Sequence, residues 1–115
     1  MKLLIADPSK RMRELIKLMC CELGDEVCEC ASASALLEDC ATRRPDCVIL
    51  DESLAGDNFA GLVRRIKSIL PAARVVVLSL DPTPWFQEMA AEAGASACVP
   101  KEDLRQLRQV IRDIG

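Results

Sequence analysis

Short apolar runs alternate along this chain with longer stretches whose apolar residues recur at every third or fourth position. The runs at residues 47–50 and 75–78 are apolar throughout, and the second is mostly β-branched, which is typical of a buried β-strand. Strands that are apolar on both faces and are joined by helices form a parallel sheet with helices packed on both sides. The sequence therefore predicts an α/β fold built around a parallel sheet.

Five strands and five helices are predicted in alternation. The predicted strands are residues 3–6, 27–31, 47–50, 75–78 and 97–99. The predicted helices have apolar residues at helical spacing, within segments 12–19, 36–40, 62–70, 85–93 and 104–114. We expect Asp7 and Thr83 to cap the first and fourth helices, and Gly94 to end the fourth. Trp85 and Phe86 are expected to serve core packing and partly exposed packing, and not to form a ligand-binding platform.

Composition limits the class of protein. A chain of 115 residues, half of them hydrophobic, predicts one domain over residues 1–115, and with 3% aromatic residues its core is aliphatic. A net charge of -3 and a pI near 5.0 argue against a basic nucleic-acid-binding face. No apolar run approaches the roughly 20 residues that span a membrane. Strand-like residues begin at Lys2, leaving no room for a signal peptide. We expect a cytoplasmic domain without direct nucleic-acid or membrane contacts.

The seven cysteines do not form a recognisable metal or redox motif. The chain has no histidine, and no two cysteines have the Cys-x-x-Cys spacing. We expect reduced thiols that act as small hydrophobic residues, with Cys40 and Cys47 buried.

Polar residues follow the predicted strands at their carboxyl ends. They are Asp7, Ser32, Asp51, Ser79 and Lys101. In parallel α/β sheets the functional site lies beyond these strand ends. We therefore expect Asp7 and Asp51 to face each other across neighbouring strands, with a hydroxyl and an ammonium group nearby.

This set of side chains suits phosphoryl transfer. Two carboxylates, Asp7 and Asp51, are suitable ligands for a hard divalent ion such as Mg²⁺. A carboxylate beside a metal ion and a fixed cation can accept a phosphoryl group, since the cations offset the charge that develops on it. Ser79 and Lys101 can then hold the phosphoryl oxygens. Structural roles stay open for each residue: a turn cap for Asp51, backbone bonding for Ser79, and solvation or an ion pair with Asp51 for Lys101.

Four segments together resemble a known family. They read LLIADPSKRMRELI, RPDCVILDESLAG, ARVVVLSL and EAGASACVPK. In order and spacing they resemble the receiver domains of two-component response regulators, of the chemotaxis-regulator type. The resemblance covers essentially the whole chain. It implies a flavodoxin-like fold, with a doubly wound, five-stranded parallel sheet of strand order 2-1-3-4-5 and five helices.

The resemblance also implies a function for the strand-end residues. Asp51 stands at the phosphoacceptor position, Ser79 at the hydroxyl position and Lys101 at the lysine position. Asp7 matches one member of the acidic pair, so Mg²⁺ would be held by Asp7, Asp51 and a backbone carbonyl near Ser53. The implied phosphoryl donor is a histidine kinase or a phosphotransfer protein, and the fourth and fifth helices are an implied homodimer face. Such a domain catalyses at most its own phosphorylation and dephosphorylation.

Several residues depart from the family pattern. Pro8 replaces the second acid of the pair, which predicts weak Mg²⁺ binding. Leu80 follows Ser79 where the family favours a small residue, and Cys98 replaces an aromatic residue on the fifth strand that senses phosphorylation. These departures favour an alternative function, a pseudo-receiver that binds other proteins with little or no phosphorylation.

Unrelated enzymes of similar size fit the sequence poorly. A phosphatase of the haloacid dehalogenase type has a second aspartate two positions after its nucleophile, where this chain has Ser53. A dinucleotide site needs a glycine-rich first turn, and the segment ADPSKRM has no glycine. A thioredoxin-like enzyme needs the Cys-x-x-Cys motif. We therefore expect a signalling domain and not an enzyme.

Overall fold

The computed structural model describes residues 1–113. Its centre is one parallel sheet with strand order β2-β1-β3-β4-β5, which confirms the predicted topology. The strands are β1 (Lys2–Ala6), β2 (Glu26–Cys30), β3 (Cys47–Asp51), β4 (Arg74–Ser79) and β5 (Ala97–Pro100). Each strand begins or ends within one residue of its predicted bounds.

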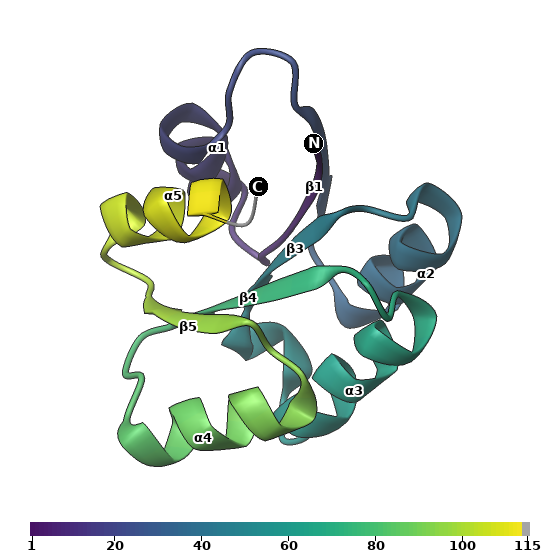
Figure 1. Ribbon diagram of the computed structural model, residues 1–115, viewed down its shortest axis with the longest axis vertical. Coiled ribbons are helices and arrows are strands. Elements are labelled where there is room, and N and C mark those ends of the chain that lie inside the picture. The colour runs from purple at the N-terminus through teal and green to yellow at the C-terminus, as the bar shows by residue number, and fades with distance from the viewer. Residues whose placement is uncertain (114–115) are drawn as a thin grey trace.

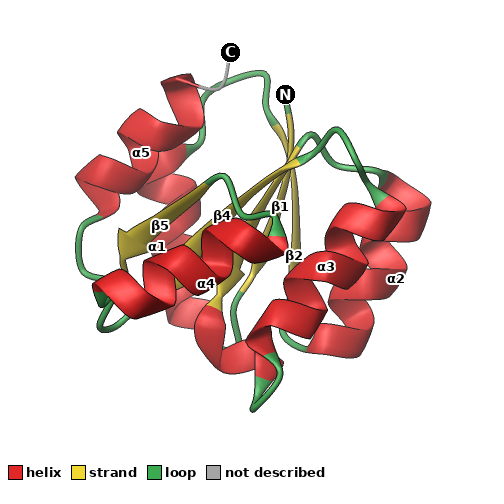
Figure 2. Cartoon of the chain, turned by 60° about the horizontal axis from the view of Figure 1, so that its bottom comes forward, coloured by secondary structure: helices red, strands yellow, loops and turns green. Residues whose placement is uncertain are grey.

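The helices cover both faces of the sheet, as Figures 1 and 2 show. They are α1 (Lys10–Cys20), α2 (Ala33–Arg43), α3 (Phe59–Ile69), α4 (Pro84–Ala93) and α5 (Leu104–Asp113). Helices α1 and α5 lie on one face, and α2, α3 and α4 lie on the other. A short 3-10 helix, η1 (Glu52–Ala55), follows β3 and was not predicted. Ile114, expected on the last helix, lies outside the described residues.

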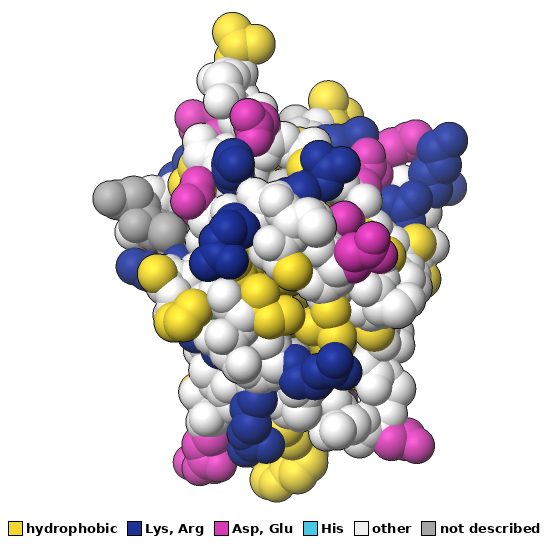
Figure 3. All heavy atoms as spheres, turned by 90° about the vertical axis from the view of Figure 1, so that its right-hand side faces the viewer, with side chains coloured by type: hydrophobic (Ala, Val, Ile, Leu, Met, Phe, Trp, Pro, Cys, Tyr) yellow, Lys and Arg dark blue, Asp and Glu magenta, His cyan; other side chains and the backbone are white. Residues whose placement is uncertain are grey.

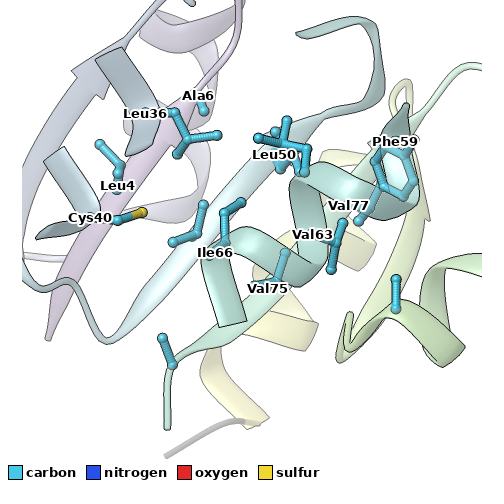
Figure 4. Packing of buried hydrophobic residues seen from close by; sticks show 14 of the residues in the cluster. Leu4, Ala6, Leu36, Cys40, Leu50, Phe59, Val63, Ile66, Val75 and Val77 are labelled. Carbon is cyan, nitrogen blue, oxygen red and sulfur yellow. The ribbon is translucent and has the colours of Figure 1, made fainter. Parts of the chain in front are cut away.

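The two faces of the sheet have separate aliphatic cores. On the central strand β3, Ile49 packs with α1 and α5, whereas Leu50 packs with the other three helices. Side chains of a strand point alternately to opposite faces, so a strand buried on both sides is apolar at every position. Figure 4 shows the larger core, in which Leu50, Val63 and Val77 come together from two strands and a helix.

Helix α4 places its two aromatic residues differently. Thr83 caps the helix, Pro84 occupies its first turn, and Gly94 ends it in a left-handed conformation (φ +116°), all as predicted. Phe86 is buried and its ring centroid lies 5.0 Å from that of Phe59. Trp85 is 70% exposed, so of the two residues only Phe86 is part of the core. Adjacent helical residues point about 100° apart, and here Phe86 faces the sheet while Trp85 faces solvent.

Helix α1 begins and packs differently from the prediction. Ser9, not Asp7, is its N-cap, because the Ser9 hydroxyl accepts a hydrogen bond from the Met12 N–H at 3.2 Å. The buried face has Ile16 and Cys20 at its centre. Leu15 and Met19, placed on the apolar stripe by their spacing, are exposed. The helix is thus rotated so that one i, i+4 pair enters the core and the neighbouring pair faces solvent.

The cysteines, the charged surface and the lengths of the helices can also be compared with the sequence predictions. All seven cysteines are free thiols, and Cys40 and Cys47 are fully buried, as expected. Figure 3 shows a face where basic and acidic side chains are interspersed around exposed hydrophobic ones. Among residues 1–113 no helix has the length and apolar character needed to cross a bilayer.

Candidate functional site at the carboxyl edge of the sheet

Four of the five predicted strand-end residues lie together at the carboxyl edge of the sheet. Asp7 directly follows β1, Asp51 and Ser79 end β3 and β4, and Lys101 directly follows β5. The fifth, Ser32, follows the edge strand β2 and has a structural role, since its hydroxyl caps α2 by accepting from the Ala35 N–H at 3.2 Å. The strand order explains the difference, because β2 is the edge strand farthest from β4 and β5.

Asp7 and Asp51 face each other across neighbouring strands, as predicted. Strands β1 and β3 pair in register up to Ala6 and Leu50, so the aspartates that follow occupy equivalent places. Both are almost completely buried, with 1% and 2% of their surface exposed. Two adjacent buried carboxylates repel each other and lose hydration, so they require a cation between them.

Lys101 supplies that cation. Its Nζ lies 2.7 Å from Oδ1 of Asp51 and 3.1 Å from Oδ2 of Asp7. Burial alone would lower the pKa of Lys101, but the contacts with Asp51 and Asp7 outweigh it and raise the pKa above its ordinary value. The backbone N–H of Lys101 donates to the Ser79 carbonyl at 2.8 Å, which fixes the start of the side chain at the end of β4. The ammonium group therefore stays charged and held between the carboxylates.

The second oxygen of Asp51 is also engaged. The Ser53 hydroxyl donates to Oδ2 of Asp51 from within η1. The Asp51 side chain makes no capping hydrogen bond to η1, so the turn-cap alternative has no support in the structure. Asp51 thus has one oxygen bound to an ammonium and the other to a hydroxyl group.

Ser79 is at the predicted place but has an unexpected partner. Its hydroxyl donates to Oε1 of Glu52 at 2.8 Å, and the Leu80 N–H donates to the same oxygen at 3.2 Å. Glu52 was not among the site residues predicted from the sequence. Glu52 directly follows Asp51 at the end of β3, at the sheet edge where Ser79 also lies. This position could have indicated that Glu52 belongs to the site.

The acidic pocket has features suited to a divalent ion. Oδ2 of Asp7 is buried, and apart from its ion pair with Lys101 it has no hydrogen-bond partner. Within residues 1–113 no three acidic, histidine or cysteine side chains gather as a metal site. An ion here would therefore have two carboxylates, Asp7 and Asp51, and otherwise neutral oxygens such as the Ser53 carbonyl. Oxygen donors of this kind fit Mg²⁺.

The pocket opens to solvent through a shallow depression. Its lining residues lie at or just after the ends of β3, β4 and β5: Asp51, Glu52, Ser53, Gly56, Leu80 and Lys101. The Leu80 side chain is 81% exposed and lines this depression together with Asp51 and Lys101. A small group can therefore approach Asp51 from this side.

Comparison with known proteins identifies the family. The family model described as the response regulator receiver domain matches residues 3–112. The chain belongs to the receiver-domain family. It is 34% identical over 110 residues to the DNA-binding transcriptional regulator NtrC of Azospirillum brasilense. That match covers 95% of this chain and 23% of the relative, so the chain spans less than a quarter of the length of NtrC.

Solved structures have the same fold. A two-component response regulator of the LuxR family from Aurantimonas sp. superposes with a TM-score of 0.87 at 29% identity, covering 98% of this chain and 83% of that one. A response regulator of Burkholderia pseudomallei, solved with a phosphorylated aspartic acid, a calcium ion and citrate, has a TM-score of 0.78 at 15% identity. That alignment covers 98% of this chain and 73% of the other, and it shows similarity of fold alone.

Family membership confirms the resemblance found in the sequence. Receiver domains are signalling domains of two-component systems and not conventional enzymes. Receiver domains interact with histidine kinases or phosphotransfer proteins, and they generally bind Mg²⁺ at an acidic pocket. The roles of individual residues of this chain stay predictions.

Proposed function

We propose that this chain, as one receiver domain over residues 1–115, accepts a phosphoryl group on Asp51 from the phosphohistidine of a histidine kinase or phosphotransfer protein. The observation that carries the proposal is the contact of 2.7 Å between the buried Asp51 carboxylate and the Lys101 ammonium. A nucleophile beside a fixed cation at the edge of a solvent-accessible depression is suited to attack a negatively charged phosphoryl group.

The proposed step is an in-line displacement at phosphorus. One oxygen of Asp51 attacks, the phosphorus–nitrogen bond of the protonated phosphohistidine breaks, and its electron pair stays on the departing neutral imidazole. Lys101 neutralises charge on the transferred group and then binds one of its oxygens. The Ser79 hydroxyl donates to another phosphoryl oxygen. The same Asp51 acyl phosphate is later hydrolysed, so the domain catalyses at most its own phosphorylation and dephosphorylation.

Mg²⁺ would be held by Asp7, Asp51 and the Ser53 carbonyl. When bound, it supplies positive charge that stabilises the transferred phosphoryl oxygens. We expect weak binding, because Mg²⁺ keeps its waters firmly and Pro8 gives no third carboxylate to compete with them.

Intact-mass spectrometry tests the proposal. The protein is incubated with acetyl phosphate and MgCl₂, and the Asp51→Asn variant is treated in parallel. We expect an increase of one phosphoryl mass in the natural chain and none in the variant. An adduct of the same size on Asp51→Asn would contradict the assignment of Asp51.

A pseudo-receiver is the second candidate function. It is favoured by the hydrogen bond of 2.8 Å that commits the Ser79 hydroxyl to Glu52, together with Pro8 and Cys98 at positions that differ from the family pattern. Such a domain would bind partner proteins with little or no phosphorylation. The same mass measurement separates the two functions, because a pseudo-receiver gives little or no adduct with acetyl phosphate or with a phosphorylated kinase.

Self-association is a further part of the proposal. Trp85 on α4 is exposed, and Arg105 and Arg108 lie exposed on α5, so a homodimer through these helices has both apolar and charged contacts available. Sedimentation velocity with the natural chain and Trp85→Ala tests it. A cytoplasmic location and the lack of direct nucleic-acid binding stay predictions from the sequence.

A further inference from the structure

One carboxylate oxygen of Glu52 accepts two hydrogen bonds from the start of the β4–α4 connection. Oε1 of Glu52 accepts the Ser79 hydroxyl at 2.8 Å and the Leu80 N–H at 3.2 Å. The Asp81 N–H donates in turn to the Ser79 oxygen at 3.2 Å. Ser79 is fully buried, so its hydroxyl has no access to solvent as an alternative partner. Glu52 therefore fixes both a side chain and the backbone of this segment.

The Ser79 hydroxyl has a single proton to donate. While that proton is shared with Glu52, it is not available to a phosphoryl oxygen on Asp51. A bond to a carboxylate is stronger than one to a neutral acceptor, so releasing Ser79 has a substantial free-energy cost. The two acceptors compete for one donor.

The negative charge of Glu52 also opposes a phosphoryl group on Asp51. Glu52 directly follows Asp51, and a phosphoryl group adds about two negative charges at that place. The Glu52 carboxylate also lies close enough to Cys98 to contribute, after burial, to raising the pKa of that thiol to about 11. The Glu52 carboxylate therefore lies near β4 and β5, on the side where Ser79 would contact a phosphoryl group.

We propose that Glu52 is a positioning residue that latches Ser79 and Leu80 in the resting state and thereby opposes retention of a phosphoryl group on Asp51. Phosphorylation releases the latch, because Ser79 exchanges Glu52 for a phosphoryl oxygen. The Leu80 N–H loses its partner in the same event, so the β4–α4 connection becomes free to move. This inference rests on the proposed phosphorylation of Asp51.

Beryllofluoride, which mimics the phosphoryl group on an aspartate, is the probe. Its affinity is measured in MgCl₂ by titration followed with amide NMR for the natural chain, Glu52→Gln and Glu52→Ala. Glu52→Ala is expected to bind roughly five- to tenfold more tightly, the gain expected when one charge-assisted hydrogen bond no longer competes. Glu52→Gln keeps an acceptor oxygen without the charge and should fall between the two. Glu102→Ala is the matched control, since it removes an exposed glutamate next to Lys101 and should leave the affinity unchanged.

A second measurement reports the latch without any phosphoryl mimic. Amide hydrogen exchange at Leu80 should be faster in Glu52→Ala than in the natural chain, and beryllofluoride should speed it in the natural chain only. Equal beryllofluoride affinities, or unchanged exchange at Leu80, overturn the latch while leaving the proposed function intact. If neither chain binds beryllofluoride and neither gains mass with acetyl phosphate, the proposed function fails and the latch fails with it.

Discussion

The ammonium of Lys101 lies 2.7 Å from the carboxylate of Asp51 and joins the last strand of the sheet to its central strand. The same ammonium lies 3.1 Å from Asp7, so one cation serves two almost fully buried carboxylates. The arrangement stabilises the site and also places positive charge where the proposed phosphoryl transfer needs it.

Replacing Lys101 should lower both the stability of the protein and its phosphorylation. Lys101→Met leaves Asp7 and Asp51 without their cation, so we expect a loss of about 1–3 kcal/mol in the free energy of unfolding at neutral pH. Phosphorylation by acetyl phosphate should fall at least roughly tenfold, since a fixed charge at the transferred group is lost. Urea unfolding and intact mass measure the two effects. Arg64→Met, which removes an exposed cation on α3, is the control; equal behaviour of the two variants would contradict the role of Lys101.

Restoring an acid at position 8 should strengthen Mg²⁺ binding. Pro8 is exposed beside the buried Asp7, and α1 is capped by Ser9, so Pro8→Asp leaves the helix start intact. A third carboxylate competes better with the waters of the ion, and we expect severalfold tighter binding by titration calorimetry. Pro8→Asn separates the effect of charge from that of losing proline. No difference between Pro8→Asp and the natural chain would show that the missing acid does not limit binding.

The response to phosphorylation should stay local. Cys98 on β5 packs against the core beside α4 and is too small to move between buried and exposed positions as an aromatic ring does. A modification shifts an equilibrium only by its differential interaction with the two states. With beryllofluoride and MgCl₂ we expect amide shifts near Asp51 and Leu80, and small ones along α4 and α5. Cys98→Phe should extend them; large shifts across both helices in the natural chain would point to another route of switching.

Acid stability should depend on Asp25, in the turn before β2. Burial acts to raise the pKa of Asp25, but hydrogen bonds from Arg112, from the Glu22 N–H and from the amino terminus outweigh it and lower the pKa from 3.8 to about 2. A carboxylate with a lowered pKa contributes stability that is complete above its ordinary pKa and is lost as the pH falls through the folded value. This contribution should therefore disappear between about pH 4 and pH 2.

The Asp25→Asn variant tests this contribution. At pH 7 it should lose about 1–2 kcal/mol in the free energy of unfolding, because charge-assisted hydrogen bonds become neutral ones. Its stability should also change less than that of the natural chain between pH 4 and pH 2. Asp57→Asn, at an exposed aspartate, is the comparison. A pH profile of Asp25→Asn that parallels the natural chain would contradict the assignment.

The sheet and the place of the site could both be predicted from the residues alone. Apolar runs such as residues 75–78 predict buried strands because both of their faces must be covered. The polar residues that follow them were then expected at one edge, and Asp7, Asp51 and Lys101 do meet there. Local rules also found the cap at Thr83, because an N-cap depends on residues within one helical turn.

Which atoms bind one another at that edge depends on how the helices and strands pack in three dimensions. Asp7 satisfies the rules for a helix cap, but the ion pair with Lys101, from the far end of the chain, places it in the pocket while Ser9 caps the helix. The partner of the Ser79 hydroxyl depends on where η1 places Glu52 beside β4. Local sequence does not determine such choices, because hydrogen bonds and ion pairs form between whichever groups the packed elements bring within about 3 Å of each other.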